Sequence, residues 1–354
     1  MIWSFGYWKR YMMESGNRIF LDGDASELVF SFAFNDDENT SIKHEARVQF
    51  QRTLRVPDDG VEYPLPAGLG SFPLLHSRSQ KLDLPAHMKS RGGVVFPIYP
   101  FEAAWMNFYC ESMFPIALRI AAGKINAVTG DDWSESTPEI QDYVVLPDQY
   151  WLDGFNTGDG QVRQFVAAKL GANLTVEEQV TGRSEWGGIQ ILAIPMKSER
   201  YIELLQNNHG ALDGAVMCMS EAPECMSLEM DMSMDMGMGQ GGTIRQTIED
   251  DPYGIDAWDF EKAQRVFVSM IDARAWPKVG GEAIPTPVTS EQYEKEGIPW
   301  FNLEGFSDVP KSEKLSKLKS VQAGMVELGV EVDTISPTVT APIQVSRSVI
   351  DGSW

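Results

Sequence analysis

The stretch "EARVQFQRTLRV", Glu45 to Val56, carries the clearest structural signal in the sequence. Its apolar residues occupy even positions and its polar residues occupy odd ones, with Arg52 as the exception. The apolar positions are Ala46, Val48, Phe50, Leu54 and Val56. Because successive side chains of a strand point to opposite faces, this alternation predicts a long strand with one buried face and one wet face.

Other segments rich in apolar and β-branched residues, each bounded by Gly, Pro, Asp or Asn, predict further strands. They lie in residues 18–34 (two strands around a turn), 93–99, 117–130, 142–147, 160–171, 173–182, 187–197 and 264–273. Helical patterns are fewer and cover residues 198–208, 289–297 and 312–321. Short strands without regular helical crossovers predict a mainly β fold, with antiparallel sheets forming a sandwich or barrel, few short helices and long irregular connections.

The same patterns divide the chain into five parts. Residues 1–16 form an aromatic N-terminal arm, 17–206 a β-rich core and 207–242 a Met-rich flexible insertion. Residues 243–275 supply strands that complete the core, and 276–354 form an irregular C-terminal arm with short helices. The chain is therefore expected to have one main core.

The charge balance narrows the set of partners. Lys and Arg total 29 and Asp and Glu total 51, so the formal net charge is −22. Nucleic acids and anionic membrane surfaces are bound through clustered Lys and Arg, so both are unlikely partners for so acidic a chain. The expected partners are proteins, further copies of this chain or uncharged molecules such as carbohydrate.

The cysteine content and the N-terminal sequence indicate the cellular compartment of the protein. Cys110, Cys218 and Cys225 are too few for a disulfide framework. Neither a signal peptide nor an apolar stretch long enough to cross a membrane is visible. The sequence predicts a cytoplasmic or otherwise intracellular protein without membrane insertion.

The stretch "VMCMSEAPECMSLEMDMSMDMGMGQGG", residues 216–242, invites a metal hypothesis. Methionines alternate with small and acidic residues from Met230 to Met238, and thioethers are soft ligands that suit Cu(I). Methionine is also common where flexible side chains need no fixed partner, and this composition buries little apolar area. The sequence favours a flexible loop without a cofactor and leaves copper binding as an alternative.

The run "YWLDGFNTGDGQ" offers a first candidate binding loop, with Trp151, Asp153, Asn156 and Asp159 as its candidate residues. Carboxylates and an amide beside an aromatic plate suit a sugar or a Ca²⁺ ion. The alternative is ordinary turn chemistry, in which Asp and Asn bond to nearby backbone.

The run "DPYGIDAWD" offers a second loop of the same character, with Asp251, Asp256, Trp258 and Asp259 as candidate residues. Two such loops at one end of a sandwich could bring paired carboxylates to a glycoside. Motifs for a catalytic nucleophile, a zinc site or a phosphate loop are not visible, so no catalytic residue is predicted.

The first residues of the chain contain four large aromatic side chains, Trp3, Phe5, Tyr7 and Trp8. A short segment has no long periodic element of its own with which to bury them, and exposed apolar patches mark interaction sites. We therefore expect these residues to mediate self-association, which makes a homo-oligomer the expected state.

Four segments carry a family resemblance: "DYVVLPDQYWLDGF", "VRQFVAAKLGANLTVEEQVTGRSEWGGIQI", "DPYGIDAWD" and "GIPWF". In them the sequence resembles a widespread microbial protein family of unknown function, over about residues 52–301. The resemblance implies a single unit with a variable Met-rich insertion and brings no activity with it.

Three hypotheses about function follow. The leading one is a non-enzymatic β-rich protein that binds a partner or assembles with itself as a structural protein. The second is a carbohydrate-binding or glycoside-active protein that uses the two acidic and aromatic loops. The third is binding of copper or another metal by the Met-rich segment.

Overall fold

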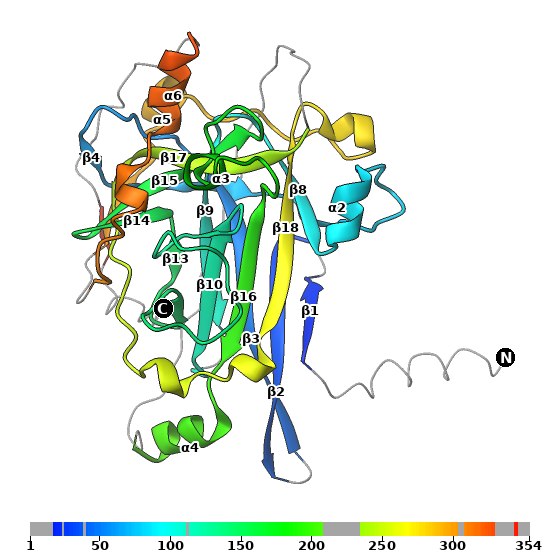
Figure 1. The fold of residues 1–354 in the computed structure, drawn as a ribbon, viewed down its shortest axis with the longest axis vertical. Coiled ribbons are helices and arrows are strands. Elements are labelled where there is room, and N and C mark those ends of the chain that lie inside the picture. Colours follow the sequence, from blue (N-terminus) through cyan, green and yellow to red (C-terminus); the bar gives the residue numbers. More distant parts are fainter. Residues whose placement is uncertain are drawn as a thin grey trace, which may run out of the picture.

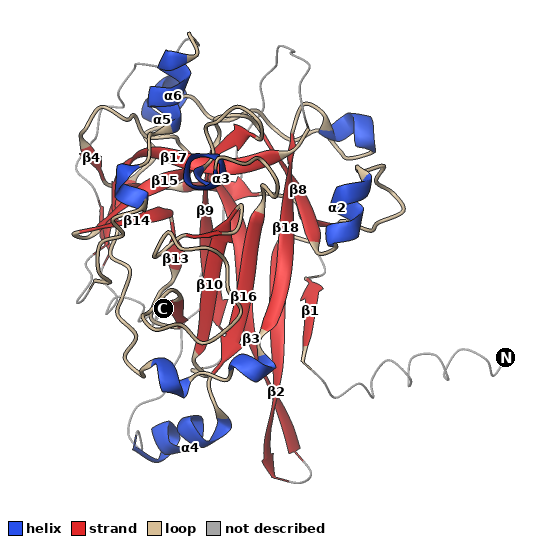
Figure 2. Cartoon of the chain, viewed as in Figure 1, coloured by secondary structure: helices blue, strands red, loops and turns tan. Residues whose placement is uncertain are grey.

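Strands dominate the computed structural model, which describes residues 17–22, 25–37, 40–110, 113–207, 234–303, 308–329 and 343–345. Figure 1 shows two layers of strands, and Figure 2 shows short helices at their periphery. The prediction of a mainly β fold is confirmed. Neither large sheet closes into a barrel.

The larger sheet has ten strands, with the order β1-β2-β3-β9-β15-β17-β4 along its main path. β6 also pairs with β3, β13 with β9 and β14 with β15. All pairs are antiparallel except the one between β17 and β4. The strands are β1 (Arg18–Leu21), β2 (Glu27–Asp37), β3 (Thr40–Thr53), β4 (Glu62–Tyr63), β6 (Gly68–Ser71), β9 (Ala103–Cys110), β13 (Trp151–Leu152), β14 (Gly154–Gly158), β15 (Gln161–Lys169) and β17 (Met236–Arg245).

The smaller of the two large sheets has seven strands, with the order β11-β10-β16-β18-β8-β7 and with β12 paired to β10. Its pairs are antiparallel except for β18 and β8. The strands are β7 (Leu75–His76), β8 (Val94–Ile98), β10 (Ile116–Ala122), β11 (Ile125–Asn126), β12 (Val144–Leu146), β16 (Ile189–Pro195) and β18 (Gln264–Asp272).

A third, three-stranded sheet and short helices complete the described fold. The sheet comprises β5 (Leu65–Pro66), β19 (Trp300–Leu303) and β20 (Ile343–Val345). The α-helices are α2 (Ala86–Arg91), α3 (Val176–Thr181), α4 (Ser198–Asn207), α5 (Ser290–Lys295) and α6 (Val321–Glu327). Four single turns of 3₁₀ helix are η1 (Ile255–Ala257), η2 (Phe260–Lys262), η3 (Trp276–Val279) and η4 (Leu315–Lys317). In the described part of the chain, no helix is long and apolar enough to cross a membrane.

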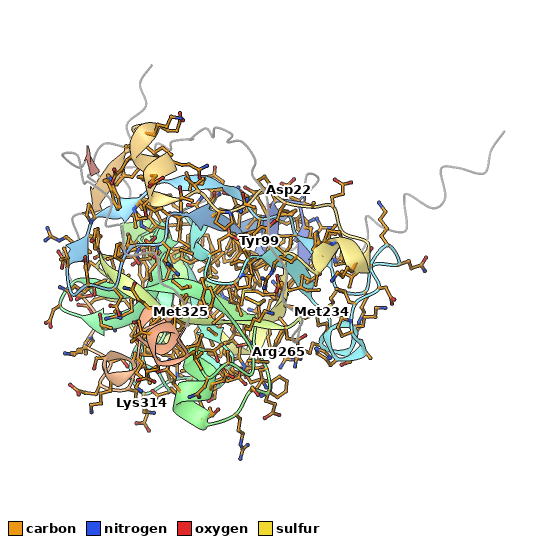
Figure 3. All side chains as sticks on the ribbon, turned by 90° about the horizontal axis from the view of Figure 1, so that it is seen from above. Asp22, Tyr99, Met234, Arg265, Lys314 and Met325 are labelled. Carbon is orange, nitrogen blue, oxygen red and sulfur yellow. The ribbon has the colours of Figure 1, made fainter. Side chains whose placement is uncertain are left out.

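The hydrophobic core lies between the two large sheets. Phe50 of β3 stacks on Phe96 of β8, with ring centroids 5.1 Å apart, and Phe72 packs on the same ring at 4.9 Å. Figure 3 shows the layers from above, with Asp22 at the side of the ten-stranded sheet and Arg265 of β18 on the opposite side. A single cluster of buried apolar residues extends from Leu28 to Leu315, so the described chain has one main core.

β3 confirms the strand predicted from the alternating pattern, but its polar face is drier than expected. The apolar residues at even positions are all buried, including Phe50 at 1% exposed. Gln49, Gln51 and Thr53 on the other face are also buried, although the pattern predicts a wet face. β3 is paired with β9 on one side and with β2 and β6 on the other, and Gln49 and Gln51 bond to each other, to Glu27 and to Ser71. A one-strand pattern cannot reveal these neighbours.

Residues 173–182 form a helix, not the predicted strand. Thr175 caps α3: its side chain accepts a hydrogen bond from the Glu178 N–H, and the Glu178 carboxylate accepts one from the Thr175 N–H. This reciprocal arrangement is a capping box, which satisfies two backbone donors at a helix start. The helix predicted for residues 312–321 is likewise reduced to η4, and α6 begins at Val321 after its cap, Ser320.

The predicted Met-rich insertion at 207–242 is wrong for its last residues, because 236–242 belong to β17, a buried strand that pairs with β15 and β4. Met236 and Met238 are buried on one face of the strand. On the other face a Cβ at Gly239 would lie 2.4 Å from the Leu174 carbonyl oxygen and from Val321, so only glycine permits this approach. The alternation of Met and Gly is therefore a strand pattern. Residues 208–233 lie outside the described part of the chain.

The C-terminal region contains the predicted short helices but is not a separate arm where it is described. Tyr293, Trp300 and Leu315 are buried members of the main core cluster, and Trp276 belongs to a second one. α5 begins at its predicted cap, Thr289. The aromatic side chains of this region are what bind it to the sheets.

Candidate functional site

The first candidate loop is part of the sheet and its polar groups serve the fold. The Asn156 amide donates hydrogen bonds to the Val128 and Pro310 carbonyl oxygens, at 3.1 and 3.0 Å, and its oxygen accepts one from the Gly158 N–H at 2.8 Å. Asp159 is exposed in the turn between β14 and β15. One local hydrogen bond and two bonds to distant backbone segments therefore account for Asn156 as a structural residue.

Asp153 is the most unusual residue of this loop, because it is fully buried. Neither carboxylate oxygen has a hydrogen-bond partner among the described residues. Burial raises the pKa of the Asp153 carboxyl well above its usual value. The Trp151 indole opposes that rise, yet within the described part of the chain its N–H makes no well-formed hydrogen bond. The surroundings therefore favour the neutral acid.

In the second candidate loop, Asp251 is the acid that contacts buried aromatic side chains. The Asp251 carboxylate accepts hydrogen bonds from the Tyr143 hydroxyl at 2.7 Å and from the Trp258 indole at 2.8 Å. Burial and this bond to Asp251 raise the pKa of the Tyr143 hydroxyl. Trp258 is 2% exposed, so its ring is unavailable to a ligand.

The other two acids of this loop, Asp256 and Asp259, have different partners from Asp251. The Asp256 side chain is 80% exposed, with an oxygen 3.8 Å from the Arg200 guanidinium. Asp259 caps η2 by accepting a hydrogen bond from the Lys262 N–H, and it pairs with the Lys262 ammonium at 2.8 Å. These contacts stabilise local turns.

The two loops are neighbours, but their tryptophans belong to different aromatic clusters. Trp151 packs edge-on against Trp105, whereas Trp258 packs against Tyr143 and Tyr253. Gln149 connects the loops by donating to the Trp151 carbonyl oxygen and accepting from the Glu249 N–H. The pocket of paired carboxylates that the sequence suggested is therefore not formed by these contacts.

The metal hypothesis rests mostly on residues that are not described. Met236 and Met238 are core side chains, which corrects their place in the proposed ligand set. Among the described residues, no three His, Cys, Asp or Glu side chains are grouped so as to hold a metal ion.

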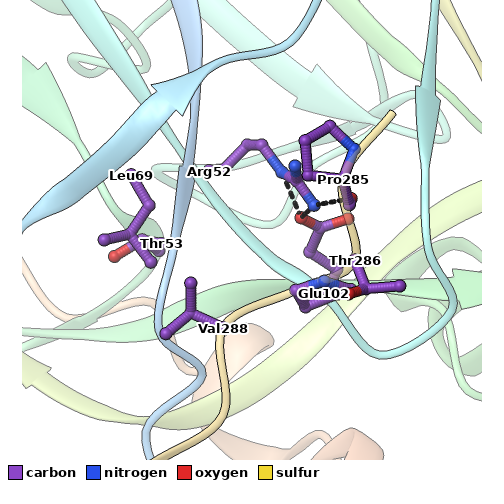
Figure 4. A pocket seen from close by; sticks show the side chains of 8 residues that line it. Arg52, Thr53, Leu69, Glu102, Pro285, Thr286 and Val288 are labelled. Carbon is purple, nitrogen blue, oxygen red and sulfur yellow. Dashed lines mark hydrogen bonds and ion pairs between the residues drawn. The ribbon is translucent and has the colours of Figure 1, made fainter. Parts of the chain in front are cut away.

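Arg52, the exception in the alternating pattern, lines a small cavity at one end of the core (Figure 4). Its guanidinium bonds to the Glu102 carboxylate and to the Pro285 carbonyl oxygen, each at 2.6 Å. Burial raises the pKa of Glu102, against the opposing effect of Arg52. The cavity, of about 30 Å³, has room for very few water molecules. The pair holds the segment around Pro285 onto β3 and β9.

A polar and aromatic surface lies on the side of the ten-stranded sheet that faces away from the core. We call it the outer face and define it by six residues: Gln49 and Gln51 of β3, Trp105, Asn107 and Tyr109 of β9, and Trp151 of β13. Cross-strand pairing aligns them, since Gln51 lies opposite Trp105, and Asn107 lies opposite both Gln49 and Trp151. Trp105, Asn107 and Trp151 are half-buried and Tyr109 is 41% exposed.

Hydrogen bonds hold the amides of the outer face in place. The Gln49 oxygen accepts from Gln51 at 3.0 Å and from Asn107 at 3.2 Å, while the Gln49 amide donates to Glu27 at 2.6 Å. The Gln51 amide also donates to the Ser71 hydroxyl. The result is an ordered polar network beside indole and phenol rings.

Sequence reasoning missed most of the outer face, although a signal was present. In "AAWMNFYC", the residues Trp105, Asn107 and Tyr109 alternate with the buried Met106 and Phe108. Because aromatic residues occur on both faces of β9, the alternation of inward and outward side chains is hard to recognise in the sequence. Only Trp151 of the predicted site residues belongs to this surface.

A second surface lies at the end of the molecule formed by α4 and the hairpin of β2 and β3 (Figure 1). There the rings of Phe34, His44, Phe114 and Tyr201 pack together, with centroids 4.2 to 6.0 Å apart. Four exposed apolar side chains adjoin this cluster, and we call them the α4 end: Ile42 (41% exposed), Met113 (56%), Ile202 (39%) and Leu205 (41%).

The predicted self-association anchors Trp3, Phe5, Tyr7 and Trp8 lie outside the described residues. Comparisons with protein-family models, curated proteins and solved structures find no match. The family resemblance of residues 52–301 therefore stays a prediction, and function is argued from the surfaces of this chain alone.

Proposed function

We propose that this chain is a non-enzymatic, β-rich protein that assembles with copies of itself through the α4 end. The observation that carries the proposal is the exposure of Ile42, Met113, Ile202 and Leu205 at one end of the molecule. Exposed apolar side chains gathered in one region are typical of interaction surfaces. Their burial in an interface removes apolar area from water, which favours association.

The arrangement of the candidate acids supports the non-enzymatic part of the proposal. Asp251 is engaged by Tyr143 and Trp258, and Asp153 is enclosed in the protein. A general acid and base need access to the substrate proton that they transfer. Asp153 lacks that access, and both oxygens of Asp251 already accept hydrogen bonds from the protein.

The aromatic N-terminal residues would add a second contribution to assembly. Each large aromatic side chain that becomes buried contributes on the order of 2 kcal/mol. The net charge of −22 opposes association, but salt at physiological strength limits this repulsion to about 8 Å. An intracellular location, expected from the sequence, fits either mode of assembly.

Charge substitution at the α4 end tests the proposal. We expect Ile202→Asp combined with Leu205→Asp to elute later than the wild-type chain in size-exclusion chromatography, because buried carboxylates would oppose the interface. The matched control is Val326→Asp, since Val326 is 64% exposed on α6 at the other end of the molecule. Equal elution of all three proteins would contradict the proposed interface.

A further inference from the structure

The outer face combines two kinds of chemistry that one class of ligand needs at the same time. The rings of Trp105, Trp151 and Tyr109 offer apolar π surfaces, and Asn107 places an amide between them along β9. Neighbouring strands lie about 4.8 Å apart and alternate residues on one strand about 7 Å apart, so the groups form a regular array. A ligand that fits must be apolar on one side and rich in hydrogen-bonding groups at its edges.

The Asn107 amide is held in place by the buried amides of Gln49 and Gln51. Gln49 accepts from Gln51 and Asn107 and donates to Glu27, so these side chains have already lost much of their rotational freedom. Pre-ordered polar groups lose less entropy when a ligand binds. Among the described residues, the Asn107 oxygen takes no part in this network, so a hydrogen bond from a ligand would not have to displace one of these bonds.

The charges beside the outer face restrict the ligand further. The Arg47 guanidinium lies 2.6 to 3.1 Å from three carboxylates, those of Asp22, Glu27 and Glu45. One positive and three negative groups give this edge a net negative charge. Anionic ligands, including nucleic acids and phosphorylated molecules, are therefore disfavoured.

We propose that the outer face is a binding site for a neutral saccharide chain. The C–H faces of sugar rings would stack on Trp105 and Tyr109, and their hydroxyl groups would exchange hydrogen bonds with Asn107. The site differs from the two acidic and aromatic loops and shares only Trp151 with them. It does not depend on self-association, because the α4 end is made of other residues.

Titration calorimetry of the full chain tests this site. The probes are neutral oligosaccharides built from glucose, mannose, xylose or N-acetylglucosamine. We expect at least one to bind, and Trp105→Ala or Asn107→Ala to weaken that binding by about tenfold or more. Trp186→Ala is the matched control, because Trp186 is also half-buried but packs on Lys124 and Arg91. The affinity of this variant for the oligosaccharide should stay within about twofold of the wild-type value.

A second variant, Tyr109→Ala, tests the site if Trp105→Ala does not fold. Tyr109 is 41% exposed, so Tyr109→Ala should keep the wild-type unfolding temperature and still lose affinity. The proposal is overturned if no oligosaccharide binds, if the variants bind as well as the wild-type chain, or if only a cationic probe such as oligolysine binds. Measuring the mass of the same samples separates this result from a failure of assembly.

Discussion

The side chain of Gln49 shows how much a single residue can depend on neighbours that are distant in sequence. An exposed glutamine on a strand costs under about 0.5 kcal/mol when replaced by alanine. Gln49 is 9% exposed and bonds to Glu27, Gln51 and Asn107, so its removal takes one hydrogen-bond partner from each of these three side chains.

We therefore expect Gln49→Ala to lower the free energy of unfolding by about 1 to 3 kcal/mol. Phe50→Ala should cost more, about 3 to 5 kcal/mol, because it leaves a cavity beside Phe96. Lys43→Ala, at an exposed position of the same strand, is the control. Urea unfolding measures all three, and a Gln49→Ala cost equal to that of the control would refute the buried network.

Asp153 makes a prediction about pH. Its pKa is raised in the folded protein, so the folded state holds the proton more tightly than the unfolded state does. Stability linked to this group is therefore largest at low pH and falls as the pH rises from about 4 towards the raised value.

Asp153→Asn removes this proton and keeps the shape of the side chain. We expect the variant to be more stable than the wild-type chain above neutral pH, by about 1 to 3 kcal/mol, with a smaller advantage in acid. Thermal unfolding from about pH 5 to about pH 8 measures the difference. Asp256→Asn, at a side chain that is 80% exposed, is the control. A parallel profile for Asp153→Asn would exclude a buried carboxyl that titrates.

At the scale of elements, β17 makes the sharpest packing prediction. Gly239→Ala places a methyl group 2.4 Å from the Leu174 carbonyl oxygen and 2.4 Å from the Val321 side chain. Both neighbours must therefore move away from β17. We expect a loss of about 1 to 3 kcal/mol in unfolding free energy, with the start of α3 and of α6 displaced.

Met238→Leu is the matched control on the opposite face of the same strand, since it nearly conserves volume and should cost less than about 1.5 kcal/mol. Urea unfolding compares the two variants. A Gly239→Ala protein as stable as the wild-type chain would mean that α3 and α6 do not pack on β17 as described.

How far the sequence predicts an element depends on what surrounds it. β3 was predictable, because apolar and polar residues alternate in it from Glu45 to Gln51. β9 was not predictable, because a strand pattern expects polar residues on the outward face and apolar residues on the inward face. In β9 the outward face carries the aromatic Trp105 and Tyr109, opposite the inward Met106 and Phe108. α3 was missed because β-branched residues suggested a strand, although Thr175 and Glu178 carry a capping signal.

The candidate sites were harder to predict than the fold. Acidic residues in turn-rich loops are typical both of binding sites and of ordinary turns, and only their partners distinguish the two. Asn156 bonds to backbone from two distant segments, at Val128 and Pro310, which no local pattern contains. The outer face is likewise assembled from three strands that are separated in sequence.

At the scale of the whole molecule, the two proposed surfaces lie on different parts of the fold and have different chemistry. The α4 end is apolar and suits a second copy of the chain, whereas the outer face is polar and aromatic. Trp105→Ala on the outer face and Leu205→Asp at the α4 end should act independently, because residues without shared partners usually do.

The N-terminal aromatic residues give a separate prediction at this scale. If Trp3, Phe5, Tyr7 and Trp8 help to hold the assembly, deleting residues 1–10 should lower the mass in solution or weaken association. Sedimentation velocity over a range of concentrations measures the change. An assembly unaffected by the deletion would restrict the interface to the α4 end.

The mass of the unmodified chain in solution, measured by light scattering, tests self-assembly most directly. One chain has a mass of 39.5 kDa. The proposal predicts a multiple of that mass at physiological salt, where repulsion from the net charge of −22 is screened beyond about 8 Å. A mass of 39.5 kDa that stays constant as the protein is concentrated would contradict it.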